Sequence, residues 1–466
     1  MPDVLVAGAG PTGLMLANWL VKLGVDVMVV DGKEGPTTES RALVVQARSL
    51  EVYDQLGLAE QVLGQARRAT ALAPGFGSRV FGRVALGPAG EGLTAYPWIE
   101  ILEQSRNEQI LYANLRALGG SVRWGSPLES VTESDGGVVA SVGGQTVRAR
   151  YCVGADGANS LVRRALGIGF EGVTNPHLFY VIDATGVAGL VADAINVRPS
   201  GNEFVIAFPM RGRHNFRLIG LVGSPSFALP EARDRLRSRF AVTFGDSRWF
   251  ATYKVHHRVA THFRERTFFL AGDAAHVHSP VGGQGMNTGL QDAHNLAFKL
   301  ADVLRGRATD RWLDRYEHER RPVAEVLVGT TDRIFAAVTS QRPWWRAARR
   351  VAVPLIGPAA LRLAPRSRLF EYVSQIRIRY PGGGRRLPWT GGNHEVLRDN
   401  QWQIHGYGAP AVPFPLPYHS FPAHDRFRPD LLYLVRADGF VAAAAPPATA
   451  AEEFRAVMTG LGLVVP

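Results

Sequence analysis

The hydrophobic pattern at the start of the chain changes twice between continuous apolar runs and helical spacing. The run Val4–Ala7 precedes a glycine-rich turn, and a second apolar run, Val25–Val30, ends at Asp31. Between the two runs, apolar residues share one helix face at Leu14, Ala17, Leu20 and Val21. This order predicts a strand, a helix and a second, parallel strand, which together form a β-α-β unit.

Two later segments show the same change from a strand pattern to a helix pattern. The run Val147–Gly154 leads into Asp156 and Gly157, and Ser160 is then placed to cap a short helix. Thr267–Ala271 predicts a buried strand before a loop. After that loop, apolar residues recur every four or three positions at Met286, Leu290, Ala293, Ala297, Leu300 and Leu304, which predicts an amphipathic helix.

The glycines of the first turn form the pattern Gly-x-Gly-x-x-Gly. Gly8 permits a tight turn, Gly10 lets backbone approach a pyrophosphate, and Gly13 lets the helix pack closely on the strand. The helix N-terminus, which includes Pro11 and Thr12, adds free N–H groups and the positive end of its dipole. The pattern predicts a dinucleotide site, for FAD or for NAD.

The acid at the end of the second strand completes this prediction. Asp31 lies about 20 residues after the glycines, where a carboxylate accepts hydrogen bonds from a ribose. Glu34 is a competitor, less well placed because it follows the strand end. A carboxylate here disfavours a 2′-phosphate, and therefore NADP, in this pocket.

The three motifs together resemble the fingerprints of class A flavoprotein monooxygenases, the para-hydroxybenzoate hydroxylase-like group. They are Gly8–Gly13, Asp156–Ser160 with Arg163, and Gly272–Asn287. The chain is most similar to the bacterial branch that acts on aromatic polyketides and antibiotics, which includes rifampicin monooxygenase and anthracycline-pathway hydroxylases. Further segments that match this branch are Ser40–Val52, Leu102–Gln109, Asp314–Pro322, Ser374–Tyr380 and Leu434–Phe440.

The resemblance implies FAD as the cofactor and NADPH or NADH as a transient co-substrate. It implies that Asp31 binds the adenosine ribose, that Arg41 and Gln104 contact the flavin side, that Asp156 supports the pyrophosphate indirectly, and that Asp273 holds the ribityl chain. The other implied cofactor contacts around the flavin are Gly272, Pro280, Gly282, Gly283, Gly285, Met286 and Asn287. Pro280, Gly283 and Gln284 are expected to position the flavin edge during catalysis.

The implied activity is hydroxylation of an aromatic or polyketide-type small molecule by O2, through a flavin C4a-hydroperoxide. A Baeyer–Villiger-type or quinone-pathway monooxygenase and a non-oxygenating flavin oxidoreductase stay open as alternatives. No catalytic base is assigned; Tyr180, His214 and Arg217 are regional candidates only.

The predicted fold is α/β. A Rossmann-like, glutathione reductase-like FAD-binding domain is expected at residues 1–75, 99–171 and 265–377. Apolar and polar residues alternate over 172–264, which with 76–98 predicts a mostly antiparallel substrate-binding domain. For residues 378–466 the resemblance implies a short thioredoxin-like region, in an incomplete or degenerate version. No cysteine follows Cys152, so packing rather than thiol chemistry is its expected role.

Composition and charge limit the classes of partner that we expect for this chain. The net charge of +11 and pI near 10.1 raise nucleic acid as a partner, but no nucleic-acid-binding signature accompanies the scattered arginines. The first apolar run begins close to Met1, which leaves no room for a signal peptide. Val351–Leu361 is too short to span a membrane and contains two prolines. We therefore expect a cytoplasmic monomer or homodimer without membrane contact.

The histidines invite a metal hypothesis that the spacing does not support. His276 and His278 lack a convincing third ligand, so no metal site is predicted, and His276 is expected to order its loop. His256 and His257 are expected at surface or hinge positions.

Overall fold

The computed structural model describes residues 1–38, 42–201, 203–222, 227–278, 283–339, 366–382 and 384–465, and the fold is mixed α/β. A six-stranded sheet has the order β19-β20-β13-β1-β2-β9, and every neighbouring pair except β19–β20 is parallel. Its strands are β1 (Val4–Ala7), β2 (Val27–Val30), β9 (Val122–Arg123), β13 (Tyr151–Gly154), β19 (Arg264–Glu265) and β20 (Phe268–Leu270). The observed strand β2 is thus shorter than the predicted run Val25–Val30.

Four helices pack near this sheet: α1 (Pro11–Lys22), α4 (Gln104–Ala117), α7 (Gly285–Leu304) and α8 (Arg311–Thr339). The contact between α1 and α7 is aromatic: Trp19 is fully buried and lies against His294 and Phe298, with ring centroids 4.9 and 5.1 Å away. The short helix α5 (Leu161–Ala165) follows β13, and Ser160 caps it by accepting the Arg163 N–H at 3.0 Å. The caps and apolar faces predicted from the sequence therefore form the main core.

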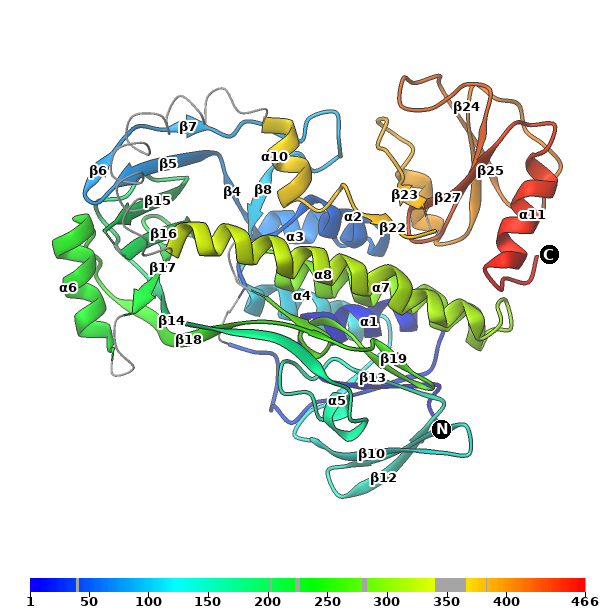
Figure 1. Cartoon of the computed structure of the whole chain (residues 1–466), viewed down its shortest axis with the longest axis horizontal. Coiled ribbons are helices and arrows are strands. Elements are labelled where there is room, and N and C mark those ends of the chain that lie inside the picture. The colour runs from blue at the N-terminus through cyan, green and yellow to red at the C-terminus, as the bar shows by residue number, and fades with distance from the viewer. Residues whose placement is uncertain are drawn as a thin grey trace.

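A nine-stranded, largely antiparallel sheet lies at the end of the molecule that carries α6 (Leu229–Phe240) (Figure 1). Its strands are β5 (Ala71–Phe76), β6 (Arg79–Val80), β7 (Val84–Ala85), β14 (Phe170–Ala184), β15 (Ala194–Ser200), β16 (Glu203–Pro209), β17 (Phe216–Val222), β18 (Ser247–Ala260) and β21 (His276–Val277). Alternation along β14 decides what each face contacts. Tyr180 and Ile182 pack with Phe240 of α6, whereas Phe179 packs with Phe204 and Val255 on the other face.

Residues 378–465, here called the C-terminal unit, lie at the opposite end (Figure 1). Their six-stranded sheet contains β22 (Arg379–Tyr380), β23 (Gly384–Arg386), β24 (Gln403–Tyr407), β25 (Tyr418–Phe421), β26 (Leu432–Val435) and β27 (Phe440–Ala445). The 3-10 helix η2 (Glu395–Asp399) and α11 (Ala450–Gly460) complete the unit. Tyr407 and Phe427 stack in its core with ring centroids 3.7 Å apart, and the Tyr433 ring meets Phe427 edge to face.

Smaller elements connect these parts. A three-stranded sheet contains β3 (Val44–Val45), β4 (Arg67–Ala69) and β8 (Ile99–Ile101), and another contains β10 (Leu128–Ser134), β11 (Gly137–Val142) and β12 (Gln145–Ala149). The remaining helices among the described residues are α2 (Ala47–Leu56), α3 (Ala59–Gln65), α10 (Arg366–Val373) and the 3-10 helix η1 (Gly272–Ala274).

One sequence prediction is wrong. His257 is neither at the surface nor at a hinge: it is buried within β18, where its neighbour His256 contacts the Thr174 hydroxyl at 3.0 Å. Alternation along a paired strand turns one of two adjacent histidines inward. Among the described helices, none is long and apolar enough to cross a membrane.

Candidate active site

A large hollow, about 2250 Å³ including its opening, lies between the parallel sheet, α7 and the nine-stranded sheet. Segments far apart in the sequence line it. They include Gly8–Thr12 of the first turn, Asp31–Lys33, Ala42–Val44, Gln104 and Glu108 of α4, Ala155–Gly157, Asp273, Gly283–Met286, and Phe208, Arg217 and Ile219 of the nine-stranded sheet. All three glycine- or aspartate-containing motifs therefore meet at one cavity.

Close backbone packing forms the end of the hollow near α1. Gly8 has φ +102°, and a Cβ placed on it would lie 2.3 Å from the Ala155 carbonyl oxygen. A Cβ on Gly13 would lie 1.9 Å from the Gly8 oxygen, so both positions exclude a side chain. On Gly10, the N-cap of α1, a Cβ would meet no described atom within 4 Å. The turn is packed on one side and open on the side of the hollow.

Asp31, which directly follows β2, holds this turn in place through hydrogen bonds. One carboxylate oxygen accepts the Ala9 N–H at 2.7 Å and the other accepts the Lys33 N–H at 2.8 Å. The Lys33 ammonium lies 3.8 Å from Asp31 and 3.6 Å from Glu108, which is almost fully buried. Asp31 is thus held in one orientation at the wall of the hollow.

The second motif is tied to the third. Asp156 accepts the N–H groups of Leu161 and Val162 at 2.7 and 3.3 Å, while its Oδ1 is buried and has no hydrogen-bond partner among the described residues. Arg163 donates to the Ala274 carbonyl at 2.9 Å and so links α5 to η1. Asp273, in η1, faces the hollow.

The start of α7 forms another part of the wall of the hollow. Gly283 has φ +62°, and a Cβ there would lie 2.8 Å from the Val44 side chain. Gln284 is the N-cap, and Gly285 and Met286 begin the helix, so their N–H groups have no intrahelical acceptor. A helix N-terminus favours negative charge next to it.

A buried ion pair lies behind η1 and β21. His276 Nε2 lies 2.6 Å from Asp292 of α7, and Arg320 of α8 donates to the same carboxylate at 2.7 Å. Burial alone would raise the pKa of Asp292, but Arg320 and His276 outweigh burial and lower the pKa to about 2. Asp292 is therefore ionised at neutral pH and holds the His276 ring in place.

The nine-stranded sheet contributes one charged residue to the hollow. Arg217 donates to both carboxylate oxygens of Asp183 at 2.6 Å, and its guanidinium lies 5.4 Å from the Trp249 ring centroid. The other two regional candidates lie elsewhere: Tyr180 is buried on the face toward α6, and His214 is exposed in a turn with φ +58°.

An apolar chamber adjoins the hollow, and Val44 lines both. The chamber measures about 790 Å³ including its opening. The lining residues come from β3, α2, β5, β7, β8, α10 and the segments next to them, and include Leu72, Leu86, Trp98, Ile99 and Phe370. None of the described residues that line the chamber carries a charge.

The structure places most of the predicted site residues at the hollow. Those that line it are Gly8, Gly10, Pro11, Thr12, Asp31, Gln104, Asp156, Asp273, Gly283, Gln284, Gly285 and Met286. Gly13, Gly272 and Asn287 lie behind this wall and pack it. Arg41, Pro280 and Gly282 lie outside the described residues.

The sequence analysis did not name other lining residues as site residues, notably Lys33, Glu108, Asn159, Arg164, Phe208 and Ile219, although Glu108 and Asn159 lie in segments that it singled out. Glu108 could have been found, because it lies one helical turn after Gln104 and accepts its amide at 3.0 Å. The side of the sheet that Phe208 and Ile219 face depends on strand register, which the sequence does not specify.

Comparison with known proteins defines the class. A family model described as an FAD binding domain matches residues 1–331, so the chain belongs to this family. The chain is 36% identical to 6-methylpretetramide 4-monooxygenase of Streptomyces rimosus over 371 residues, which cover 77% of this chain and 65% of that relative. It is also 36% identical to rifampicin monooxygenase of Streptomyces venezuelae, over 85% of this chain and 82% of the relative.

A solved ternary complex of aklavinone-11 hydroxylase with FAD and aklavinone has the same fold. It superposes with a TM-score of 0.80 at 25% identity and covers 99% of both chains. These likenesses confirm the prediction of an FAD-dependent monooxygenase of the aromatic polyketide branch. FAD as the cofactor follows from this family, in which NADH or NADPH serves as the reductant.

Proposed function

We propose that this monooxygenase hydroxylates an aromatic or polyketide-type molecule that carries no charge on its bound face. The carrying observation is the apolar chamber next to the hollow, whose described lining residues include no charged side chain. A carboxylated substrate would lose its hydration there without gaining an ion pair, which is costly. The relatives act, by name, on 6-methylpretetramide, on rifampicin and on aklavinone, which supports the same substrate class.

We also propose that FAD lies in the hollow, with its adenosine ribose at Asp31 and its flavin at Gly283–Met286. Three features of the chain fit this cofactor. The Gly8–Gly13 turn is open toward the hollow, Asp156 has a buried oxygen without a partner among the described residues, and the N-terminus of α7 lines the same hollow. Asp273, which also lines the hollow, would then hold the ribityl chain.

Each part of the wall then has a task. When bound, FAD takes hydride from NADH or NADPH and activates O2. The α7 N-terminus stabilises negative charge at the flavin edge. Phe208 and Ile219 exclude water, and Arg217, fixed by Asp183, presents one cation to the same space. Val44 separates this space from the chamber that orients the substrate.

The finer architecture is part of the same proposal. Residues 1–75, 99–171 and 265–377 would form a Rossmann-like FAD-binding domain, and residues 76–98 and 172–264 a substrate-binding domain. The parallel β1–β2 pair around α1 supports the first assignment, and the antiparallel β14–β18 region supports the second. A sheet flanked by α11 supports a thioredoxin-like C-terminal unit.

Substrate selection tests this function. Purified protein with FAD would be given NADH or NADPH and two matched panels, neutral polycyclic phenols and the same polycyclic phenols carrying a carboxylate. We expect the neutral panel to stimulate NAD(P)H oxidation, and Ala89→Trp, which fills the chamber, to raise the substrate KM without weakening FAD binding. Equal stimulation by both panels, with no effect of Ala89→Trp, would contradict the proposed substrate class.

A further inference from the structure

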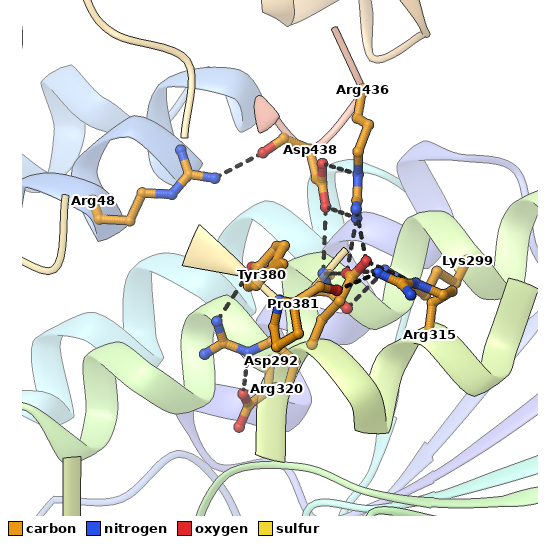
Figure 2. Close-up of polar contacts among 11 residues, drawn as sticks. Arg48, Asp292, Lys299, Arg315, Arg320, Tyr380, Pro381, Arg436 and Asp438 are labelled. Atoms are coloured by element: carbon orange, nitrogen blue, oxygen red, sulfur yellow. Dashed lines mark hydrogen bonds and ion pairs between the residues drawn. The ribbon is translucent and has the colours of Figure 1, made fainter. Parts of the chain in front are cut away.

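Buried charged side chains join the C-terminal unit to α7 and α8 (Figure 2). Arg436 donates to Glu319 of α8 at 2.7 and 3.0 Å and to Asp438 at 2.6 and 3.0 Å. Lys299 and Asn295 of α7 donate to Glu319 at 2.9 and 2.8 Å. All five residues are buried, and we call them the buried ion cluster.

The cluster stays charged at neutral pH. Burial alone would raise the pKa of Glu319, but Arg436 and Lys299 hold it well below its usual range. Burial lowers the pKa of Lys299 to about 8, and Glu319 opposes a larger decrease. Because loss of one partner leaves another charge buried and unpaired, the turn between β26 and β27 has one strongly preferred position on α7 and α8.

The same turn holds the first helical turn of α2. In Figure 2, Arg48 reaches Asp438 from the side opposite Arg436. Arg48 donates to the Asp438 backbone carbonyl at 2.7 Å and to Glu51 at 3.2 Å, and its guanidinium lies 5.2 Å from the Phe440 ring centroid. Only 2% of Arg48 is exposed, so its guanidinium interacts with these protein groups and not with solvent.

Two residues before Arg48, the same helix start contacts the candidate flavin edge. Gln46, the N-cap of α2, donates its backbone N–H to Asn287 at 2.9 Å and its side-chain amide to the Gly283 carbonyl at 3.3 Å. Asn287 donates to the Val44 carbonyl at 2.8 Å. Gly283 and Val44 both line the hollow.

We propose that Arg48 is a positioning residue for the flavin edge, and that the C-terminal unit acts through it. The buried ion cluster fixes the turn at Asp438, this turn fixes Arg48, and Arg48 fixes the Gln46 N-cap against Gly283. The C-terminal unit contains no cysteine. Through these contacts it positions residues of the hollow, which another part of the chain forms. This inference rests on the proposed FAD site.

The chain offers a matched control. Arg398 of η2 pairs with Asp54 of α2 at 2.8 Å, so it also joins α2 to the C-terminal unit, but its side chain is 55% exposed. The full-length protein with FAD would be compared with Arg48→Met, Arg48→Lys and Arg398→Met. The measurements are the FAD Kd, the flavin midpoint potential, the H2O2 released per NAD(P)H oxidised, and the thermal midpoint.

We expect Arg48→Met to weaken FAD binding about tenfold, to shift the midpoint potential and to raise the H2O2 share. Arg48→Lys should give smaller changes in the same direction, because an ammonium cannot replace the two-pronged guanidinium. Arg398→Met should leave all three flavin properties at wild-type values.

A lower thermal midpoint in Arg48→Met with wild-type FAD Kd, potential and H2O2 share would show a purely structural residue and overturn the proposal. If Arg48→Met does not fold, wild-type flavin properties in Arg48→Lys overturn it equally. Failure of the wild-type protein to bind FAD would overturn the proposed function as well. If the wild-type protein binds FAD and the Arg48 variants bind it equally well, only this inference is overturned.

Discussion

Asn287 accepts a hydrogen bond from the Gln46 backbone N–H at 2.9 Å, although 241 residues separate the two in sequence. The same fully buried side chain donates to the carbonyls of Val44 and Gly283 at 2.8 and 2.7 Å. Only a group with both donors and an acceptor can make all three bonds. One amide thus ties together the two backbone segments that face the proposed flavin edge.

Replacement of Asn287 by aspartate should damage the site despite the similar shape. A carboxylate would face two carbonyl oxygens that it cannot satisfy, so we expect a loss of about 2 kcal/mol or more in the free energy of unfolding. FAD binding should weaken as well, because Gly283 and Val44 are no longer held together. Urea unfolding and FAD titration check both effects; wild-type stability in Asn287→Asp would contradict the geometry.

The two acids near the end of β2 offer a paired test of the ribose assignment. Asp31 faces the hollow and accepts the Ala9 and Lys33 N–H groups, whereas Glu34 is exposed. We expect Asp31→Ala to raise the FAD Kd at least about tenfold, through lost hydrogen bonds to a charged acceptor. Glu34→Ala should leave the Kd unchanged. A larger effect at Glu34 than at Asp31 would reverse the assignment.

Variants of Arg217 and Asp183 distinguish the contribution of this ion pair to stability from the role of Arg217 in catalysis. Arg217→Met leaves a buried carboxylate unpaired and should cost about 3–5 kcal/mol in the free energy of unfolding. The double variant Arg217→Met with Asp183→Leu should recover most of this loss, because no buried charge is stranded. Substrate-stimulated NAD(P)H oxidation should stay low in both variants. Full activity in the double variant would show that Arg217 serves packing alone.

Buried His394 should make stability depend on mildly acidic pH. Burial, with the nearby cations Arg386 and Arg48, lowers its pKa to about 4, although Glu51 and the Leu387 carbonyl oppose the decrease. The unfolded chain binds this proton near pH 6.5 and the folded chain only near pH 4. Stability from this group is therefore complete above about pH 6.5 and falls by up to about 3 kcal/mol toward pH 4.

Urea unfolding between pH 4 and pH 7 measures this slope. In His394→Gln, whose amide can still donate to the Leu387 carbonyl, the slope should be shallower. Identical slopes in the two proteins would assign the pH dependence to other groups.

The sequence predicted those parts of the site that depend on local spacing. Gly8, Gly13 and Asp31 belong to one β-α-β unit, so their separation along the chain determines their separation in space. The same holds for the start of α7, where apolar periodicity marks the helix and the glycines mark its N-terminus.

Features that depend on strand register or on distant packing could not be predicted in this way. Tyr180 and Arg217 were equal candidates in the sequence, yet alternation places Tyr180 toward α6 and Arg217 at the hollow. His257 is buried for the same reason. Arg436 and Glu319 have the sequence character of surface residues, and their burial follows only from docking of the C-terminal unit on α8.

Isotope transfer from O2 tests the central claim most directly. The protein with FAD and NADH or NADPH would convert a neutral polycyclic phenol under 18O2, and mass spectrometry would follow the product. We predict a hydroxylated product that gains one 18O atom, with one NAD(P)H consumed for each product formed. Turnover that gives an oxidised product without 18O, while all the O2 consumed appears as H2O2, would contradict the assignment of a monooxygenase.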